Sequence, residues 1–570
     1  MPIDQITLDI LWSRLIATVN EQAAALVRTS FTAIVRDSGD LAAAVFDRRG
    51  RMVAQSVTGT PGHINPMATG MVHFLERFPI DTLKPGDVLI TNDPWMTASQ
   101  INDLTIATPV FKNGRAIALF ANCCHALDIG GRGLAADSRS VYEEGLYLPL
   151  LKLVDAGKPV EPIFDIIRAN VRTPEEVIGD IHSQMIANEV GAEQLLSFLD
   201  EFGLADIETL SDEIIDRTEA AMRKAIRDIP DGDYRSRMQI DGFDDKPITI
   251  DCCVRVRGDD IEIDFAGSSP QVPLGVNVAL NYTQGYTTYG LKCAISPDVP
   301  NNAGSFRPVR ITAPEGSILN ARHPAAVGGR HLVGHFCPSA VMMALAGALP
   351  EKVQAPGFDG IWNSQLEGEL PGDQHKRFAY IWFSAGGTGA MHGKDGLSAV
   401  AYPSGIAGFP AEVIEASSPV VMHKRELRQD SGGPGQWRGG LSQVMEYSIR
   451  TGKPVYLQSF YERTKHPAPG LHGGRPGAAG RLSADHDPQP VPKITSVINP
   501  GTTVRIELPG GGGFGTPVAR DPAAVLADVR NGYVSREAAE REYGVVVDTA
   551  RWAVDEAATR ARRAAMRLSA

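Results

Sequence analysis

Carboxylate, amide and imidazole side chains gather in one stretch of the sequence, between residues 92 and 131. An Asn-Asp-Pro motif at 92–94 opens it, Asp103 lies inside it, and His125 and Asp128 close it. Divalent ions in enzymes are bound by carboxylate oxygen and imidazole nitrogen, and the same groups transfer protons in acid–base catalysis. Asp-rich loops also cap helices and form Asx-turns. Spacing alone therefore leaves a metal or acid–base site and a set of turn carboxylates as alternatives.

The sequence around these residues predicts a hairpin that brings two of them together. Residues 106–111 and 116–121 are typical of strands, and Asn113-Gly114 between them suits a type I′ turn. Asp103 precedes the first strand and His125 follows the second. We therefore expect both side chains at the open end of the hairpin, as a shared site requires.

Other N-terminal elements follow from the spacing of apolar residues. One apolar stripe from Asp9 to Phe31 predicts a long helix, and a second helix is predicted from 205 to 229. Residues 41–54 predict another hairpin. Asp40 stands at the head of its first strand, from where it could converge on Asp103.

Beyond residue 235 the sequence becomes rich in β-strand patterns. Residues 248–256 and 260–265 alternate with period two, and glycine and proline are dense from about 384 to 515. We predict an α+β fold with mixed, mostly antiparallel sheets, long packing helices, more than one lobe and a helical C-terminal tail. The predicted segments are an N-terminal lobe that carries the candidate site (1–235), a β-rich lobe (236–518) and the tail (519–570).

Composition bounds the class of protein. The 570 residues include 67 acidic and 55 basic side chains, a net charge of -12, which argues against nucleic acid as a partner. No apolar stretch reaches the ~20 residues that a bilayer requires, and the N-terminus lacks the pattern of a secretory signal. Six cysteines without a Cys-x-x-Cys motif form no disulfide framework. We expect a cytoplasmic protein that binds neither nucleic acid nor membrane.

The glycine run at 509–515 resembles a phosphate-binding loop only superficially. It lacks the lysine and the Ser/Thr of a P-loop, and no Gly-x-Gly-x-x-Gly pattern follows a strand elsewhere. A turn that lets backbone segments approach closely is the favoured interpretation. The sequence predicts no nucleotide site in this chain, so a partner would have to bind any ATP that the protein needs.

Short motifs recur in order along almost the whole chain: 40–47, 84–87, 92–94, 125–131, 144–145, 170–172, 430–435 and 509–515. Together they resemble the hydantoinase B family, the second-subunit type of ATP-dependent hydantoinases, 5-oxoprolinases and the related acetone and acetophenone carboxylases. The resemblance implies a hetero-oligomer. In it, a hydantoinase A-type subunit carries the ATPase fold and holds the ATP.

The resemblance also implies a set of metal ligands. Asp40, Asp103 and His125 match it, but Gln100 stands where the family usually has a histidine. A glutamine carbonyl is a weaker, neutral donor, which shifts the expected ion from zinc toward manganese, magnesium or no metal. We expect zinc or manganese at these four residues. His63 could compensate for the missing histidine if its loop folds over the site.

Further polar residues could serve the same chemistry. Asp128, one short turn beyond His125, could orient imidazole or water and shuttle a proton. Arg330 and His331 match a family Arg-His motif and could contact an anionic intermediate, although structural hydrogen bonding is an equal alternative. His63, Arg330 and His331 are thus the candidate substrate-binding residues. A weaker third cluster lies at 392–395.

The expected function is that of one subunit of a heteromeric, ATP-dependent hydrolase for a cyclic amide such as a hydantoin, 5-oxoproline or a lactam. Its partner would phosphorylate the amide oxygen, and a water held at this site would attack the activated carbon, helped by a metal that lowers the pKa of the water. Two alternatives stay open: a subunit of a biotin-independent ketone carboxylase, and a non-catalytic scaffold for the ATPase partner.

Overall fold

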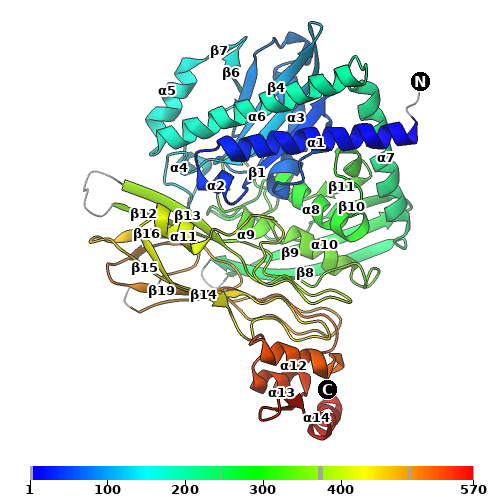
Figure 1. Ribbon diagram of the computed structural model, residues 1–570, viewed down its shortest axis with the longest axis vertical. Coiled ribbons are helices and arrows are strands. Elements are labelled where there is room, and N and C mark those ends of the chain that lie inside the picture. The colour runs from blue at the N-terminus through cyan, green and yellow to red at the C-terminus, as the bar shows by residue number, and fades with distance from the viewer. Residues whose placement is uncertain (1–3, 244–245, 370–376, 486–489, 569–570) are drawn as a thin grey trace. The chain divides into compact units, whose positions relative to one another are not determined.

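The structure, a computed structural model, describes residues 4–243, 246–369, 377–485 and 490–568 (Figure 1). It confirms the predicted fold class, because helices are combined with several mostly antiparallel sheets. The chain forms two compact units that are discontinuous in sequence. The first comprises Met1–Tyr234, Cys252–Pro338 and Ser404–Ala407, and the second comprises Arg235–Asp251, Ser339–Pro403 and Gly408–Ala570. The three consecutive segments predicted from the sequence stay a prediction.

A seven-stranded sheet lies at the centre of the first unit. Its order is β2-β1-β5-β4-β3-β6-β7, and every neighbouring pair is antiparallel. The middle strands are buried on both faces, which explains their nearly continuous apolar sequence. The strands are β1 (Leu41–Asp47), β2 (Met52–Gln55), β3 (Val88–Thr91), β4 (Asp103–Lys112), β5 (Arg115–His125), β6 (Leu151–Asp155) and β7 (Lys158–Pro159).

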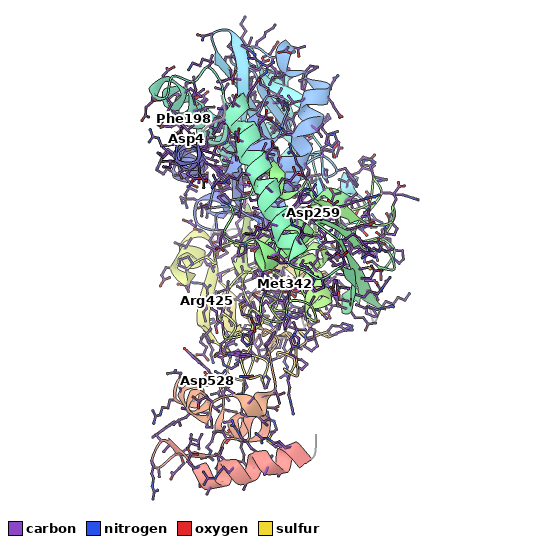
Figure 2. The ribbon with its side chains drawn as sticks, turned by 90° about the vertical axis from the view of Figure 1, so that its right-hand side faces the viewer. Asp4, Phe198, Asp259, Met342, Arg425 and Asp528 are labelled. Carbon is purple, nitrogen blue, oxygen red and sulfur yellow. The ribbon has the colours of Figure 1, made fainter. Side chains whose placement is uncertain are left out.

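Long helices cover both faces of this sheet. α1 (Gln5–Thr29) and α6 (Pro174–Glu201) pack together on one face (Figure 1), and α3 (Pro61–Arg77) packs on the other. Phe120 and Asn122 of β5 contact α6, whereas the residues that alternate with them share a hydrophobic cluster with α3. The predicted first helix is confirmed. It begins after Asp4, whose side chain caps it (Figure 2).

The remaining elements of the first unit include a helix that packs on α3, α8 (Leu280–Ile295). The others are α2 (Ala33–Arg36), α4 (Val141–Glu144), α5 (Glu161–Asn170), α7 (Glu208–Arg227), α9 (His331–Gly334), β10 (Asp260–Asp264) and β11 (Val309–Thr312). β10 pairs parallel with β11 and antiparallel with β9 (Lys246–Arg257). β8 (Gly232–Phe243) is the last strand of this sheet, and the division between the units falls within β8 and β9.

The second unit contains two four-stranded sheets, ordered β13-β12-β16-β18 and β14-β15-β19-β17. All their described pairings are antiparallel. The strands are β12 (Trp362–Glu369), β13 (Arg377–Ser384), β14 (Val420–Leu427), β15 (Gln443–Ile449), β16 (Val455–Phe460), β17 (Arg481–Ala484), β18 (Thr495–Ile498) and β19 (Thr503–Glu507). α10 (Cys337–Leu345) leads into this unit, and α11 (Ala411–Ser417) packs on β14.

Glycine-rich connections lie side by side in the second unit. The amides of Gly511 and Gly512 donate to the carbonyl oxygens of Gly440 and Pro356. A Cβ on Gly511 would lie 1.8 Å from the carbonyl oxygen of Thr388, so no other residue fits there. These amides of the glycine run are thus hydrogen-bonded to neighbouring backbone. The sequence predicted this close approach of backbone segments.

Three helices form the C-terminal tail: α12 (Pro522–Arg530), α13 (Arg536–Tyr543) and α14 (Glu556–Leu568). A small hydrophobic cluster holds α12 and α13 together. Asp528 of α12 (Figure 2) accepts a hydrogen bond from Arg520 at 2.9 Å. Across the described parts of the chain, no helix combines the length and the apolar character that crossing a bilayer needs.

Candidate functional site

The β4–β5 hairpin places Asp103 and His125 directly opposite each other. Its turn has positive φ at both central residues, 51° at Asn113 and 76° at Gly114, as a type I′ turn requires. Strand pairing continues from this turn to Asp103 and His125 at the open end. The predicted hairpin and the juxtaposition of these two residues are confirmed.

Asp40 joins them from the neighbouring strand. β1 pairs Leu41 with Cys124, so Asp40, one residue earlier, lies beside His125. The His125 amide donates to the Asp40 carbonyl oxygen at 3.2 Å. Because side chains alternate along strands, Asp40, His125 and Asp103 share the sheet face that α3 covers. Three adjacent strands thus present a row of carboxylate, imidazole and carboxylate.

Asp103 and His125 form a hydrogen-bonded pair in which the imidazole is oriented by the carboxylate. The Nδ1 of His125 lies 2.8 Å from the Oδ1 of Asp103, whose side chain is fully buried. With Nδ1–H donating to the carboxylate, the other ring nitrogen carries the lone pair. None of the described residues hydrogen-bonds to that Nε2. The pair therefore has the arrangement of a general base.

Arg330 occupies the other side of the Asp103 carboxylate. Its Nη2 donates to Oδ2 of Asp103, its Nη1 donates to Oε1 of Gln100, and its Nε donates to the carbonyl oxygen of Ala98 at 2.7 Å. The Nε2 of Gln100 donates to the carbonyl oxygen of Gly328 at 2.6 Å. All three nitrogens of the guanidinium thus donate hydrogen bonds, and both the oxygen and the nitrogen of the Gln100 amide are hydrogen-bonded.

His63 enters the same cluster from the first turn of α3, where Thr60 caps the helix. Its Nε2 lies 3.2 Å from Oδ2 of Asp103, and its Nδ1 lies 3.6 Å from Oδ1 of Asp40. Burial opposes its protonation, but the two carboxylates raise the pKa of His63 above its ordinary value. For Asp103, burial alone would raise the pKa. The positive charges of Arg330 and His63 outweigh burial and hold the pKa of Asp103 well below its usual range.

The guanidinium lies over a tyrosine ring, which in turn contacts a pair of histidines. Its central carbon lies 4.6 Å from the centre of the Tyr282 ring, a cation–π distance. The Tyr282 hydroxyl lies 3.1 Å from Nε2 of His335, whose ring centre is 5.8 Å from that of His331. Burial and the positive charge of Arg330 lower the pKa of His331 to about 3, so this imidazole is neutral.

The loop that carries Arg330 is held by Glu144. One carboxyl oxygen of Glu144 accepts from the amides of Val327 and Gly328, at 2.8 and 2.6 Å. Burial raises the pKa of Glu144 to about 8. The motif at 144–145 was visible in the sequence, but its spacing suggested no role for Glu144. Tyr282 gave no signal at all, because a tyrosine in an apolar helix carries no local mark of function.

Asp128 lies apart from this cluster. Its carboxylate accepts from Nη1 of Arg172 at 2.7 Å and from the amide of Gly130 at 3.0 Å. No hydrogen bond or ion pair among the described residues joins it to Asp103 or His125. These bonds explain the motif at 170–172 as a brace for the loop after β5. The proton-shuttling role of Asp128 stays a prediction.

Comparison with known proteins decides the family. The family model described as hydantoinase B/oxoprolinase matches residues 4–517. This chain belongs to the hydantoinase B/oxoprolinase family. It is 31% identical to the B subunit of a putative D-/L-hydantoinase from Pseudomonas sp. (strain NS671), over 96% of this chain and 95% of that protein. It is also 31% identical to the beta subunit of caprolactamase from Pseudomonas jessenii, over 99% of each.

The fold of this hydantoinase B/oxoprolinase member matches that of a solved relative. The crystal structure of the ATP-dependent caprolactamase from Pseudomonas jessenii superimposes with a TM-score of 0.88 at 29% identity, covering 99% of this chain and 100% of that one. The relatives are named as enzymes or as enzyme subunits. An enzymatic role for this chain is thereby supported, and a partner subunit is implied for the family.

The four residues expected to bind a metal do not fit a divalent ion in this arrangement. Both carboxylate oxygens of Asp103 face donors, Nδ1 of His125 is directed at Asp103, and Oε1 of Gln100 accepts from Arg330. Within the described ranges, no three His, Cys, Asp or Glu side chains form a group that could hold a metal ion. Zinc or manganese at Asp40, Gln100, Asp103 and His125 stays a prediction.

The weaker cluster at 392–395 belongs to the second unit and is an ion pair. Asp395 accepts from both terminal nitrogens of Arg520, at 2.7 and 2.6 Å, and from the amide of Arg438 at 2.7 Å. Arg520 also binds Asp528 of α12. The cluster attaches the C-terminal helices to the glycine-rich loops of the same unit.

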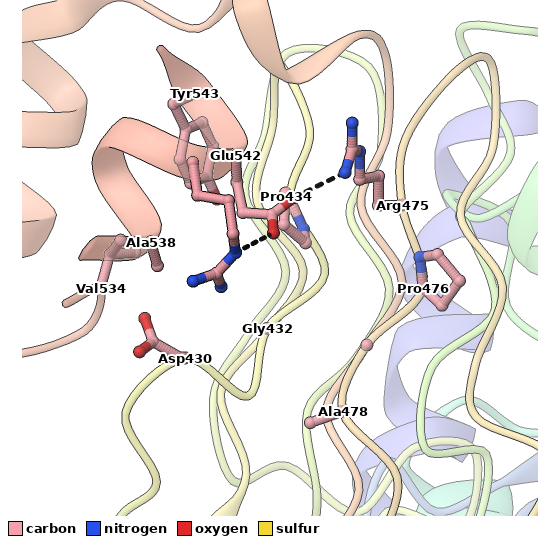
Figure 3. Close-up of a pocket in the computed structure, with 12 residues that line it drawn as sticks. Asp430, Gly432, Pro434, Arg475, Pro476, Ala478, Val534, Ala538, Glu542 and Tyr543 are labelled. Carbon is pink, nitrogen blue, oxygen red and sulfur yellow. Dashed lines mark hydrogen bonds and ion pairs between the residues drawn. The ribbon is translucent and has the colours of Figure 1, made fainter. Parts of the chain in front are cut away.

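A pocket of about 290 Å³ lies in the second unit between these loops and α13. Figure 3 shows Glu542 in the pocket wall, where it accepts from Nη1 of Arg475 and Nε of Arg541, each at 2.8 Å. Each of the two arginines thus already has a carboxylate partner. The pocket supports no assignment beyond packing of α13.

Proposed function

We propose that this chain is the hydrolytic subunit of an ATP-dependent enzyme that opens a cyclic amide. The Asp103–His125 pair carries this proposal, because its Nε2 is free to accept a proton from water. The names of the relatives, the B subunit of a hydantoinase and the beta subunit of a caprolactamase, support the class of substrate and the need for a partner. The proposed partner is a hydantoinase A-type ATPase subunit.

The chemistry follows from amide resonance, which makes the ring carbonyl a poor electrophile. Transfer of a phosphoryl group from ATP to the amide oxygen, on the partner, activates the carbon. His125 then takes a proton from water as the water oxygen bonds to that carbon, and it returns the proton to the ring nitrogen as the C–N bond breaks. The acyl phosphate that remains loses its phosphate to a second water.

Asp103 contributes by orienting the imidazole and by stabilising the imidazolium that forms during proton transfer. Because charged and hydrogen-bonding neighbours keep its carboxylate ionised, it can do so without taking the proton itself. Asp40 extends the same row, with its Oδ1 3.6 Å from Nδ1 of His63. Asp128 is retained as a candidate for proton transfer to solvent.

The test uses the chain assembled with its ATPase partner and a panel of hydantoin, 5-oxoproline and caprolactam. Ring-opened product and ADP are both quantified for wild type, His125→Ala, Asp103→Asn and the control His73→Ala, an exposed histidine of α3. We expect His125→Ala to lower ring opening by about 10²–10⁴-fold, the usual contribution of a general base. His73→Ala should match wild type.

Two outcomes would redirect the proposal. Full ring opening by assembled His125→Ala and Asp103→Asn would favour the non-catalytic scaffold. ATP turnover that requires bicarbonate and yields a carboxylated ketone would favour the carboxylase alternative. ADP release that persists in His125→Ala without ring opening would support hydrolysis at this chain after activation at the partner.

A further inference from the structure

The side chains of the buried site that could bind a metal ion lie next to a positively charged side chain of the same protein. Asp40, His63, Asp103 and His125 are residue types that bind divalent ions, and all four are at least nine-tenths buried. Yet Asp103 directs one carboxylate oxygen at His125 and the other at the guanidinium of Arg330. The negative charge of Asp103 is compensated from within the chain.

We propose that Arg330 is the permanent cation of this site and that the site excludes a divalent metal ion. The inference departs from the ligand set that the family resemblance implies. It concerns what the site binds, and it holds whichever reaction the chain serves. A metal ion at these donors would have to share a buried carboxylate with a guanidinium of like charge, and repulsion between like charges is strongest where water is excluded.

The guanidinium is held too firmly to move aside for an ion. It donates through Nε to Ala98, through Nη1 to Gln100 and through Nη2 to Asp103. The central carbon of the guanidinium also lies over the ring of Tyr282, 4.6 Å from its centre. Only arginine has a planar cation with several N–H donors in fixed directions. A lysine ammonium carries its charge on one nitrogen and has no flat face to lie against a ring.

Gln100 supports the position of Arg330 through both ends of its side-chain amide. Its carbonyl oxygen accepts from Arg330 while its amide nitrogen donates to the carbonyl oxygen of Gly328. A neutral histidine has one acceptor nitrogen and one donor nitrogen on a rigid ring, and it binds a metal through that acceptor lone pair. The neutral amide oxygen of Gln100 is a good hydrogen-bond acceptor for arginine and a weaker metal ligand than a histidine nitrogen. Gln100, at the position of the expected histidine, thus supports the guanidinium of Arg330.

The test measures metal rather than turnover. The wild-type chain, the double variant Gln100→His/Arg330→Met and the control Arg322→Met are exposed to excess Zn²⁺ or Mn²⁺, desalted and analysed by elemental mass spectrometry. Arg322 is a surface arginine in the same loop region, paired with Glu315. Affinities are compared by competition with a chromophoric chelator. Thermal melting with and without each ion reports folding and binding together.

We expect less than about 0.1 ion per chain in wild type and in Arg322→Met, with melting curves that neither ion nor chelator shifts. The double variant should hold about one ion per chain and bind it roughly 10–100-fold more tightly than wild type. A merely structural arginine would not create a metal site when removed.

A wild-type chain that carries about one ion, lost in Asp103→Ala, would overturn the inference whatever the variants do. A folded double variant that binds no more metal than wild type would also overturn it. If the double variant does not fold, Gln100→His alone decides: this variant should still bind no ion while Arg330 remains, and one ion per chain in it would contradict the proposal. None of these readouts depends on the proposed hydrolysis.

Discussion

At the scale of single residues, the site is organised by charge compensation. Asp103 is fully buried, and it is tolerated there because Arg330, His125 and His63 all contact its two oxygens. Removing one partner of such a group leaves a buried charge unpaired. The stability of the first unit should therefore depend on Arg330 far more than on any surface arginine.

Arg330→Met should lower the free energy of unfolding by about 3–5 kcal/mol, because it leaves the Asp103 carboxylate without its cation. Arg322→Met, whose side chain is largely exposed, should change it by less than about 0.5 kcal/mol. Unfolding in urea, followed by circular dichroism, measures both. Equal losses in the two variants would show that the buried pair is not a source of stability.

Glu144 should make stability depend on pH. Its pKa is about 8 in the folded chain and near 4.5 when unfolded, because burial disfavours the carboxylate. Between these values the folded state holds the extra proton, so its contribution is full below about pH 4.5 and is lost as pH rises through 8. Glu144→Gln keeps an acceptor for the loop amides and should remove this loss.

The measurement is the difference in unfolding free energy between wild type and Glu144→Gln at pH 5 and at pH 8. Each unit of pKa displacement corresponds to about 1.4 kcal/mol, so the difference should change by at least that amount in favour of the variant at pH 8. Arg330 and Glu143 are the charged groups that act on Glu144. Glu189→Gln, an exposed side chain of α6, serves as control and should follow wild type; identical slopes in all three proteins would contradict the assignment.

At the scale of elements, buried amides join α6 to the strands of the site. Nε2 of Gln184 donates to the carbonyl oxygen of Leu104 and to Oδ1 of Asn122. Asn188 accepts from Asn122 and Gln22, so α1 takes part as well. This network fixes the helices to the same strands whose ends carry the site.

Asn188→Ala should destabilise the first unit by about 1–3 kcal/mol for each buried donor left without an acceptor. Asn122 and Gln22 each lose one of two acceptors in this variant, because their amides also donate to the carbonyl oxygens of Gln184 and Ala121. Thermal melting is the measurement, with Asn170→Ala at the exposed end of α5 as a matched control. A variant that melts with wild type would mean that water or another side chain replaces the lost amide.

The sequence predicted the hairpin of Asp103 and His125 because its signals are local. Asn113-Gly114 sets the turn, and the strands fix the register between it and the site. The partnership with Arg330 could not be predicted in this way. Arg330 lies 227 residues from Asp103 and 230 from Gln100, and no pattern of spacing reports a contact of that separation. Likewise, the strands of the second unit were visible in the sequence, but not its discontinuous division from the first.

At the scale of the whole molecule, the proposed function makes the chain one part of an ATP-dependent reaction. The family model spans nearly all of it, and the amides of the glycine run described above are bonded to backbone. The Asp103 site lies entirely within the first unit. We propose that the ATPase function belongs to a separate partner.

Purified alone, the chain should leave both ATP and a cyclic amide unchanged, because an unactivated amide resists attack by water. Adding the ATPase-type partner should produce ADP and ring-opened product together. Chromatography of the amide and a coupled ADP assay follow the two reactions. Ring opening by the isolated chain without ATP would place it among simple amidohydrolases.

The long sequence separation between Asp103 and Arg330 also means that the two residues are synthesised at different times. At a synthesis rate of roughly 5–20 residues per second, the 227 residues between them take about 10–45 s to make. Asp40, His63, Asp103 and His125 all leave the ribosome before Arg330. For that interval the nascent chain carries these four side chains without the guanidinium that compensates the charge of Asp103, so the buried arrangement can be completed only after Arg330 has been made.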